Sequence, residues 1–196
     1  DFVSDRFCYE MILERLENSD TPQFIFNVTI QNHGSWDVYG GEQTITLNHS
    51  AENMRPFENL MCLYKESDDA FRYLIECLST REKPTLVVMF GDHQPAPSES
   101  FNSFIHMDEV YRTDPLTQYQ TPVVFWANYD IQTEEIPQIF STNYLNALVA
   151  EVGGIPLNGQ QKFLLEMMEQ FPIYTTEGIY DSGMNEVAAE DMEKKY

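Results

Sequence analysis

The spacing of apolar residues along the chain predicts helices that alternate with short strands. Apolar positions recur at helical spacing in four segments, and we predict helices at 5–18, 53–80, 144–152 and 159–170. Three shorter runs are rich in β-branched and aromatic residues, and we predict buried strands at 24–30, 85–90 and 122–127. Such alternation is typical of an α/β fold, so we expect a mostly parallel sheet with helices on both faces.

Some parts of this pattern are less well defined. The helical pattern from 53 to 80 indicates either one long helix or two helices that are broken near Ser67 and Asp68. Residues 98–120 show no clear period, and we expect an irregular excursion over the surface there. The segment 184–196 is charged, and we expect it to fray from the domain formed by residues 1–183.

The composition, and above all the acidic net charge, limits the kinds of partner that the chain can bind. The 196 residues include 11 basic and 32 acidic side chains, which give a net charge of -21. Such an acidic surface repels the phosphates of nucleic acids, so we expect no nucleic-acid partner. An anionic substrate would need a local positive charge, and a bound metal ion is the natural source of one. No apolar run approaches the roughly 20 residues of a membrane span, and we expect the chain itself to be soluble.

The strongest candidate site follows the predicted strand 85–90, in the Gly-Asp-His loop at residues 91–93. Gly91 allows a sharp turn, and Asp92 and His93 come directly after it. Adjacent side chains point to opposite faces of a continuing strand, but they can converge at a turn. A carboxylate oxygen and an imidazole nitrogen are suitable ligands for Zn²⁺ or Mn²⁺. The alternative is a capping aspartate that is followed by a surface histidine.

A second loop with a histidine follows the predicted strand 24–30. Its sequence at 31–36 is Gln-Asn-His-Gly-Ser-Trp. If the two strands are neighbours, His33 could reach the same crevice as the Gly-Asp-His loop, because ligands collect at the carboxyl ends of parallel strands. Its imidazole could donate a hydrogen bond to a phosphoryl or hydroxyl oxygen, and Trp36 could line the pocket. The alternatives are a loop histidine without a role and a loop aromatic that simply packs.

Together, these segments resemble the lipoteichoic acid synthase-like branch of the sulfatase and alkaline phosphatase superfamily. The resemblance is carried, in chain order, by Ser4 and Asp5 at a helix start and by the segments 26–34, 88–95, 121–126 and 141–156. It covers residues 1–180 in the order of the C-terminal half of the family's catalytic domain. It therefore implies an alkaline phosphatase/sulfatase-like fold in which residues 1–183 are the C-terminal part and the N-terminal half is missing from this sequence.

The resemblance also implies a site and a cofactor. Family members hold a divalent cation, often Mn²⁺ in this branch, with a carboxylate and a nucleophilic Thr from the N-terminal half and with the Asp and His of the Gly-Asp-His element. By that matching, Asp92 and His93 are metal ligands, and His33 contacts the phosphoglycerol group of the substrate. We expect one divalent ion, with Mn²⁺ first and Zn²⁺ or Mg²⁺ as alternatives. No catalytic nucleophile is expected within this chain, so the isolated chain is expected to be inactive.

The implied reaction is phosphoglycerol or phosphoryl transfer from a phospholipid headgroup through a covalent intermediate. It would take place at the extracellular face of a bacterial membrane, where the parent protein would be anchored. The alternatives are hydrolysis by a phosphodiesterase or sulfatase on the same scaffold, and a noncatalytic half-domain. The expected partners are the phospholipid-derived substrate and the missing N-terminal half. Without that half, an exposed apolar face or edge would favour self-association.

The remaining cysteines and histidines carry less information. Cys8, Cys62 and Cys77 are odd in number and lie in predicted helices, so we expect free thiols that pack as small apolar side chains. His49 and His106 lie outside the two candidate loops. We assign neither of these histidines a catalytic or metal-binding role.

Overall fold

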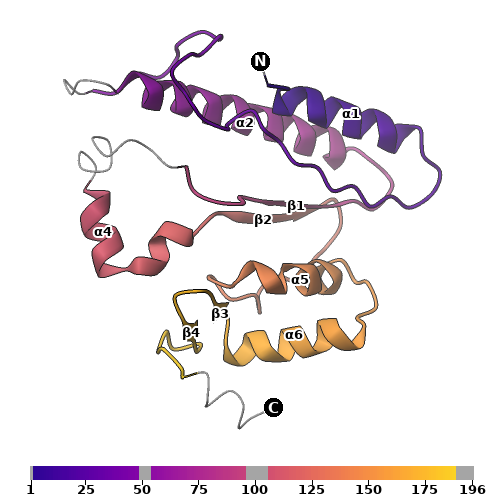
Figure 1. The fold of residues 1–196 in the computed structure, drawn as a ribbon. Helices are drawn as coiled ribbons and strands as arrows, with labels where there is room; N and C mark the ends of the chain where they lie inside the picture. The colour runs from indigo at the N-terminus through magenta and orange to yellow at the C-terminus, as the bar shows by residue number, and fades with distance from the viewer. Residues whose placement is uncertain (1, 49–53, 96–105, 189–196) are drawn as a thin grey trace. The chain divides into compact units, whose positions relative to one another are not determined.

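The structure is a computed structural model that describes residues 2–48, 54–95 and 106–188. It divides into two compact units. Figure 1 shows the helices and strands, coloured by residue number. The first unit comprises Asp1–Thr85 and Gly91–Pro122, and the second comprises Leu86–Phe90 and Val123–Tyr196. Both candidate loops therefore belong to the first unit.

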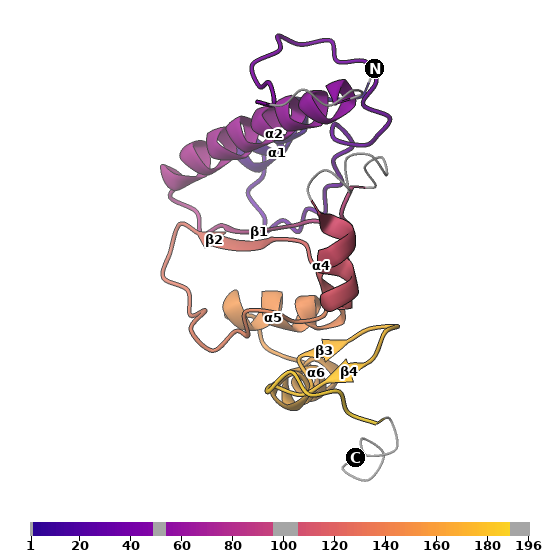
Figure 2. The same cartoon turned by 90° about the vertical axis from the view of Figure 1, so that its left-hand side faces the viewer.

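Two helices, α1 (Asp5–Glu17) and α2 (Arg55–Ser79), lie side by side in the first unit (Figures 1 and 2). The side chain of Ser4 caps α1 by accepting a hydrogen bond from the backbone N–H of Phe7 (3.2 Å). Helix α2 runs without a break, so the interpretation as one long helix is confirmed. Its buried apolar residues recur at helical spacing and are Leu60, Cys62, Ala70, Leu74 and Leu78.

The first unit also contains two short helices that the sequence pattern did not predict. They are α4 (Met107–Thr113) and the 3₁₀-helix η1 (Pro115–Tyr119). The side chain of Asp114 caps η1, because it accepts hydrogen bonds from the backbone N–H of Leu116 (3.2 Å) and from the hydroxyl of Thr117 (2.8 Å). The prediction of an irregular segment was therefore wrong for residues 107–119, while 98–105 lie outside the described residues.

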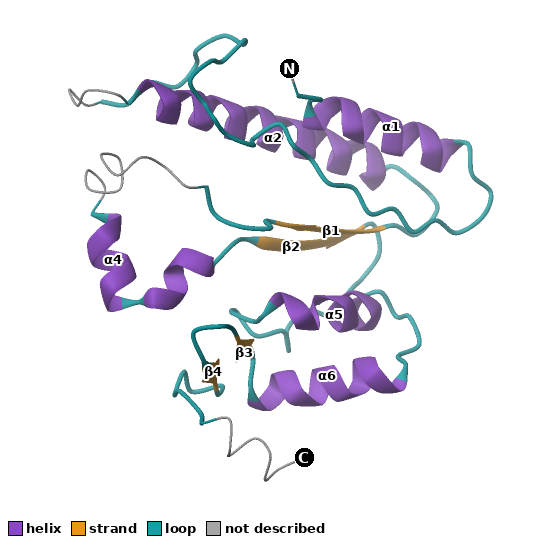
Figure 3. Ribbon diagram, viewed as in Figure 1, coloured by secondary structure: helices purple, strands orange, loops and turns teal. Residues whose placement is uncertain are grey.

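The second unit combines a two-stranded ribbon with two helices (Figure 3). Strands β1 (Leu86–Phe90) and β2 (Val123–Ala127) are antiparallel, with Leu86 opposite Ala127. The 3₁₀-helix η2 (Thr142–Tyr144) leads into α5 (Leu145–Val152), and α6 (Gly159–Gln170) follows. Asn158 and Gln161 form a capping box at the start of α6. A short antiparallel pair, β3 (Ile173–Tyr174) and β4 (Ile179–Tyr180), comes last.

The core of the second unit lies where these elements meet. Tyr144, Leu148 and Met168 form its buried cluster. The hydroxyl of Tyr144 donates a buried hydrogen bond to the carbonyl of Phe171 (2.8 Å), which satisfies both polar groups. Six partly buried side chains pack against the cluster, namely Phe125, Ile136, Phe140, Leu164, Leu165 and Met167. Since Phe125 belongs to β2, the cluster ties the helices to the ribbon.

The predicted strand 24–30 is not formed among the described residues. Most of its apolar side chains are exposed, with exposed fractions of 88% for Phe24, 70% for Phe26 and 71% for Val28, whereas Ile25 is half-buried. A strand requires a ladder of hydrogen bonds to a neighbour, and no described segment pairs with this one. The prediction of a strand that is buried on both faces was therefore wrong for residues 24–30.

The predicted mostly parallel sheet is also not present in the described parts of the chain. Both ladders there are antiparallel and two-stranded. A parallel arrangement would have required 24–30 to pair with 85–90 across a helical crossover, and the first of these segments makes no ladder. What the structure retains of the expected α/β class is the succession of helices and strands.

The structure also bears on the cysteines, on membrane-spanning helices and on the predicted C-terminal tail. The cysteines are free thiols, with Cys62 buried and Cys8 and Cys77 half-buried. Among the helices that the structure describes, none has an apolar stretch long enough to span a membrane. The first residues of the predicted tail pair with β4, because the N–H of Val187 donates to the carbonyl of Ile179 (2.8 Å). The tail from 189 onward lies outside the described residues.

Candidate metal and substrate site

The Gly-Asp-His loop begins with a turn that two hydrogen bonds fix. The backbone N–H of Gly91 donates to the carbonyl of Pro122 (3.1 Å), and the hydroxyl of Thr121 donates to the carbonyl of Gly91 (2.8 Å). A Cβ atom at position 91 would lie 2.9 Å from the Cβ of Thr121, which is closer than two such carbons can approach. The turn therefore requires glycine at this position because of the close contact with Thr121.

We expect Gly91→Ala to lower the free energy of unfolding by about 1–3 kcal/mol, because the added methyl group must displace the segment around Thr121. Urea denaturation of the chain measures this change. Gly159→Ala is the matched control, since no atom lies within 4 Å of a Cβ at that position. Equal stability of the two variants would mean that the turn at Gly91 can relax without cost.

Gln94 anchors the loop on its other side. Its side-chain amide donates to the carbonyls of Thr117 and Gln120 (both 2.8 Å), and its oxygen accepts a hydrogen bond from the hydroxyl of Tyr111 (3.2 Å). Both amide hydrogens and the amide oxygen are thus engaged by α4, η1 and the residue after η1. The sequence pattern did not predict this role, although the position of Gln94 directly after Asp92 and His93 was an available signal.

The side chains of Asp92 and His93 converge at the surface. Atom Oδ2 of Asp92 lies 3.7 Å from Nε2 of His93, and the two side chains are 80% and 70% exposed. The other carboxylate oxygen of Asp92 accepts a hydrogen bond from the backbone N–H of His93 (2.9 Å). Nδ1 of His93 lies 2.8 Å from the carbonyl of Gln94, which can only accept, so the proton of a neutral ring is on Nδ1. The lone pair of Nε2 is then available beside the carboxylate.

This pair has the chemistry of a partial metal site. Bond lengths of about 2.0–2.2 Å to nitrogen and oxygen allow one ion to contact both atoms at their separation of 3.7 Å. A backbone carbonyl on the second ring nitrogen is the arrangement that orients metal-binding histidines. Asp92 and His93 could therefore hold a divalent cation. In the part of the chain that the structure describes, no group of three or more His, Cys, Asp or Glu could hold a metal ion.

His33 lies in an exposed turn of the first unit. The backbone N–H of His33 donates to the carbonyl of Ile30 (3.0 Å), which closes the turn. Its Nδ1–H donates to the carbonyl of Gly34 (3.0 Å), and its ring meets the ring of Phe2 edge-on at 6.2 Å between centroids. With Nδ1 engaged, a neutral ring accepts a hydrogen bond at Nε2, whereas a protonated ring donates one there. This nitrogen is the atom available to a ligand.

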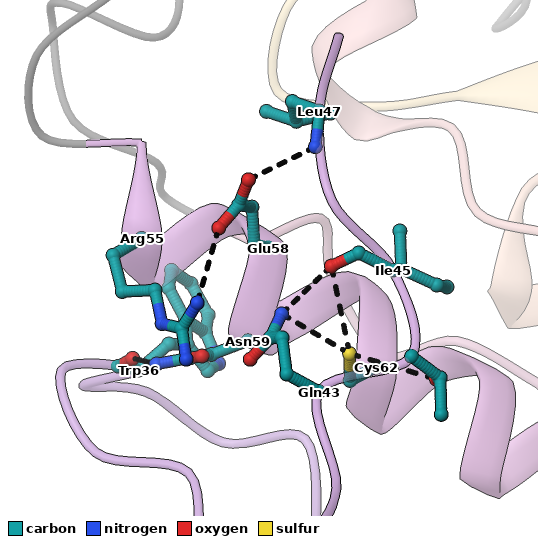
Figure 4. Close-up of polar contacts among 9 residues, drawn as sticks. Trp36, Gln43, Ile45, Leu47, Arg55, Glu58, Asn59 and Cys62 are labelled. Carbon is teal, nitrogen blue, oxygen red and sulfur yellow. Dashed lines mark hydrogen bonds and ion pairs between the residues drawn. The ribbon is translucent and has the colours of Figure 1, made fainter.

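Trp36 folds back over the turn that presents His33. Its indole N–H donates to the carbonyl of Asn32 (2.9 Å), and its ring lies 3.2 Å from where a Cβ of Gly34 would be. The side chain of Asn59 on α2 donates to the carbonyl of Trp36 (2.7 Å), and both residues are labelled in Figure 4. These contacts give Trp36 a role in closing the loop, and its role toward a substrate stays a prediction.

The loop continues along α2 as far as Leu47. The side chain of Gln43 donates to the carbonyl of Ile45 (2.7 Å) and to the sulfur of Cys62 (3.4 Å). Glu58 accepts a hydrogen bond from the backbone N–H of Leu47 (2.9 Å), as Figure 4 shows. Helix α2 therefore serves as the support for the whole loop that carries His33.

The structure brings Asp92 and His93 together, and it places His33 and Trp36 in one turn of the other loop. Among the described residues, no hydrogen bond, ion pair or ring contact links His33 or Trp36 to Asp92 or His93. The crevice predicted to be shared by the two loops therefore remains a prediction. His49 lies outside the described residues, and His106 precedes α4 with a left-handed backbone (φ 58°). An open depression of about 260 Å³ in the second unit includes none of these residues.

Comparison with known proteins identifies a family profile and several similar proteins. The profile of the sulfatase family matches residues 1–155. A Rhizobium meliloti protein described as a cyclic beta-1,2-glucan modification protein is 27% identical over 137 residues, which are 65% of this chain and 21% of the relative. The capsular polysaccharide biosynthesis protein RkpI of the same organism is 27% identical over 120 residues, which are 60% of this chain and 19% of that protein.

A solved structure shows the same fold. It is the Streptococcus pyogenes phosphoglycerol transferase GacH in complex with sn-glycerol-1-phosphate, with a TM-score of 0.70 and 21% identity. The match covers 88% of this chain and 43% of that chain, and the chain spans about a fifth of the length of the two relatives above.

Fold and family profile together define the class, and this chain belongs to the sulfatase family. The resemblance to the sulfatase and alkaline phosphatase superfamily is thereby confirmed. The similarity to the solved phosphoglycerol transferase shows that the chain shares that protein's fold.

Proposed function

We propose that this chain carries the metal-binding and substrate-orienting part of a phosphoglycerol transferase that takes its donor group from a phospholipid headgroup. The observation that carries the proposal is the convergence of Asp92 Oδ2 and His93 Nε2 in a sulfatase-family chain. The fold likeness to a phosphoglycerol transferase that was solved with sn-glycerol-1-phosphate supports the substrate class.

Asp92 and His93 would hold one divalent ion, with Mn²⁺ preferred over Zn²⁺ and Mg²⁺. When bound, such an ion supplies positive charge that polarises a phosphoryl oxygen and stabilises the charge that develops on it. Asp92 contributes the negative charge that attracts a cation to this loop. The carbonyl of Gln94 keeps the proton of a neutral His93 ring on Nδ1, so that the lone pair of Nε2 can bind the ion.

His33 would orient the phosphoglycerol group. Because its Nδ1–H is engaged by the carbonyl of Gly34, a neutral ring can accept a hydrogen bond from a glycerol hydroxyl at Nε2. A protonated ring would instead donate to a phosphoryl oxygen, with the added strength of a charged donor. Trp36 closes the turn beside it and would form the apolar side of the same subsite.

The nucleophile and the remaining metal ligands are proposed to come from sulfatase-domain residues outside these 196. In the proposed reaction, the nucleophile's hydroxyl oxygen forms a bond to phosphorus while the bond between phosphorus and the diacylglycerol oxygen breaks, and the proton that the nucleophile gives up passes to the diacylglycerol oxygen. An acceptor hydroxyl then forms a bond to phosphorus while the bond to the nucleophile breaks, and the proton of the acceptor returns to the nucleophile. The descriptions of the two Rhizobium relatives support a glycan hydroxyl as acceptor. The outer face of a bacterial membrane is the proposed location.

The full-length protein, assayed with Mn²⁺ and phosphatidylglycerol labelled in its headgroup glycerol, is expected to release diacylglycerol and to transfer the label to a glycan acceptor. His33→Ala is expected to raise the KM for this donor by about 10- to 100-fold, because one hydrogen bond to a charged donor molecule is lost. Release of sulfate from an aryl sulfate would instead identify a sulfatase. Labelled glycerol phosphate that is released to water would identify a phosphodiesterase. Absence of both turnover and metal would favour a noncatalytic module.

A further inference from the structure

The first unit buries a carboxylate that the proposed chemistry does not use. Asp5, the first residue of α1, is 3% exposed, and Asn59 is the other buried polar residue in the described parts of the chain. No described Lys, Arg or His forms an ion pair with Asp5. Burial of a carboxylate without a cation is costly unless hydrogen bonds compensate. The chain has 32 acidic residues, and the burial of Asp5 therefore needs a structural or functional explanation.

A chain of hydrogen bonds leads from Asp5 to the loop that presents His33. The hydroxyl of Ser67, in the middle of α2, donates to Oδ2 of Asp5 (2.6 Å). The side-chain amide of Asn32 donates in turn to the hydroxyl oxygen of Ser67 (3.0 Å). Burial raises the pKa of Asp5, and the hydrogen bond from Ser67 opposes that rise. The carboxylate thus fixes the direction of the Ser67 hydroxyl, which leaves its oxygen to accept from Asn32.

A second set of hydrogen bonds holds Gln31, the residue before Asn32. The backbone N–H of Asp5 donates to the side-chain oxygen of Gln31 (2.7 Å), and the side-chain amide of Gln31 donates to Glu66 on α2 (2.6 Å). The two residues that precede His33 are therefore both held between the start of α1 and the middle of α2. On the other side, Trp36 donates to the carbonyl of Asn32.

The exposed ring of His33 has few contacts of its own. It meets the carbonyl of Gly34 and the edge of Phe2, both of which lie in exposed or half-exposed chain. The position of its Nε2 is consequently set by the backbone at 31–34, and the buried anchor of that backbone is the Asp5–Ser67–Asn32 chain.

We propose that Asp5 is a positioning residue that acts through Ser67 and Asn32 to fix the loop presenting His33 to the substrate. This inference rests on the proposed function for its kinetic consequence, but its structural part can be tested without any turnover. It places the role of Asp5 in substrate orientation and not in metal binding.

The structural test is hydrogen–deuterium exchange of the full-length protein, followed by mass spectrometry. Ser67→Ala and Asp5→Ala are expected to speed exchange in peptides that cover 31–36, while Ser67→Thr keeps the hydroxyl and should restore the slow exchange. Asp68→Asn is the matched control, since this neighbour of Ser67 is exposed and pairs with Arg72 on the surface. Unchanged exchange at 31–36 in both alanine variants would overturn the proposal.

The kinetic test uses phosphatidylglycerol turnover by the same variants. Ser67→Ala is expected to raise the KM for this donor about tenfold, with little change in kcat. In a His33→Ala background, Ser67→Ala should have no further effect on KM, because the group that it positions is absent. Additive effects of the two substitutions would reject the positioning role. If the unmodified protein does not turn over phosphatidylglycerol, the proposed function is wrong, while the exchange experiment still decides whether Asp5 and Ser67 hold the loop.

Discussion

Asp92→Ala and His93→Ala, each made in the full-length protein, are expected to remove the bound divalent ion and to lower phosphatidylglycerol turnover by about 10³-fold or more. Each substitution deletes one of the two donor atoms that converge to 3.7 Å at the protein surface. A phosphoryl group that loses the cation loses its main source of charge stabilisation, which is commonly the largest contribution to catalysis. Elemental analysis measures the metal content, and release of diacylglycerol measures the turnover.

Asp68→Ala provides the comparison for this experiment. Asp68 is also an exposed aspartate of the first unit, but it pairs with Arg72 one helical turn away and faces no histidine. We expect the metal content and turnover of this variant to equal those of the unmodified protein. If Asp92→Ala retained both the metal and the activity, Asp92 would not be a ligand, and the proposed function would lose the observation on which it rests.

The helices could be predicted from the sequence because their signal is local. The apolar stripe that includes Leu60, Leu74 and Leu78 follows the period of a helix, and these side chains are buried in α2 as that stripe predicts. The capping residues Ser4 and Asn158 act within three residues of their own position. Helices α4 and η1 were missed, since segments of seven and five residues are too short to show a period.

Strand pairing could not be predicted in the same way. The run at 24–30 has the residue types of a strand, but these types show only that a segment suits a pleated surface. A ladder also needs a partner at the right register, which is a long-range property. Strand β1 pairs with β2 in antiparallel direction. The end of β1 at Phe90 and the start of β2 at Val123 are 33 positions apart in the sequence. The local pattern predicts neither the partner of β1 nor the direction of the pairing.

The candidate site also combines features that are local in the sequence with contacts between distant residues. The convergence of Asp92 and His93 followed from a glycine turn after a strand, which is a local signature. The anchoring of their loop by Gln94 depends on carbonyls 23 and 26 residues away. The anchoring of the His33 loop by Asp5 depends on Ser67, which is 62 residues away from it. Local chemistry could thus be predicted from the sequence, whereas the contacts that hold it in place could not.

Leu148→Ala is expected to lower the free energy of unfolding by about 2–5 kcal/mol, the largest stability effect that we expect of a single substitution in the second unit. Leu148 is fully buried between Tyr144 and Met168, at the centre of the cluster that joins α5, α6 and β2. Removing its branched end leaves a cavity among side chains from three different elements. The surrounding side chains cannot easily move to fill this cavity, because each of them is held by its own helix or strand. Urea denaturation of the chain measures the change.

Ile155→Ala is the matched control for the core substitution. Ile155 follows α5 by a few residues and is 56% exposed, so its truncation should cost less than about 1 kcal/mol. The difference between the two variants isolates the effect of burial from that of side-chain size. An equally small effect of Leu148→Ala would mean that the cluster around Tyr144 does not hold the second unit together. In that case, the connection between the helices and β2 would have to depend on the partly buried side chains around the cluster, with Phe125 of β2 as the first to test.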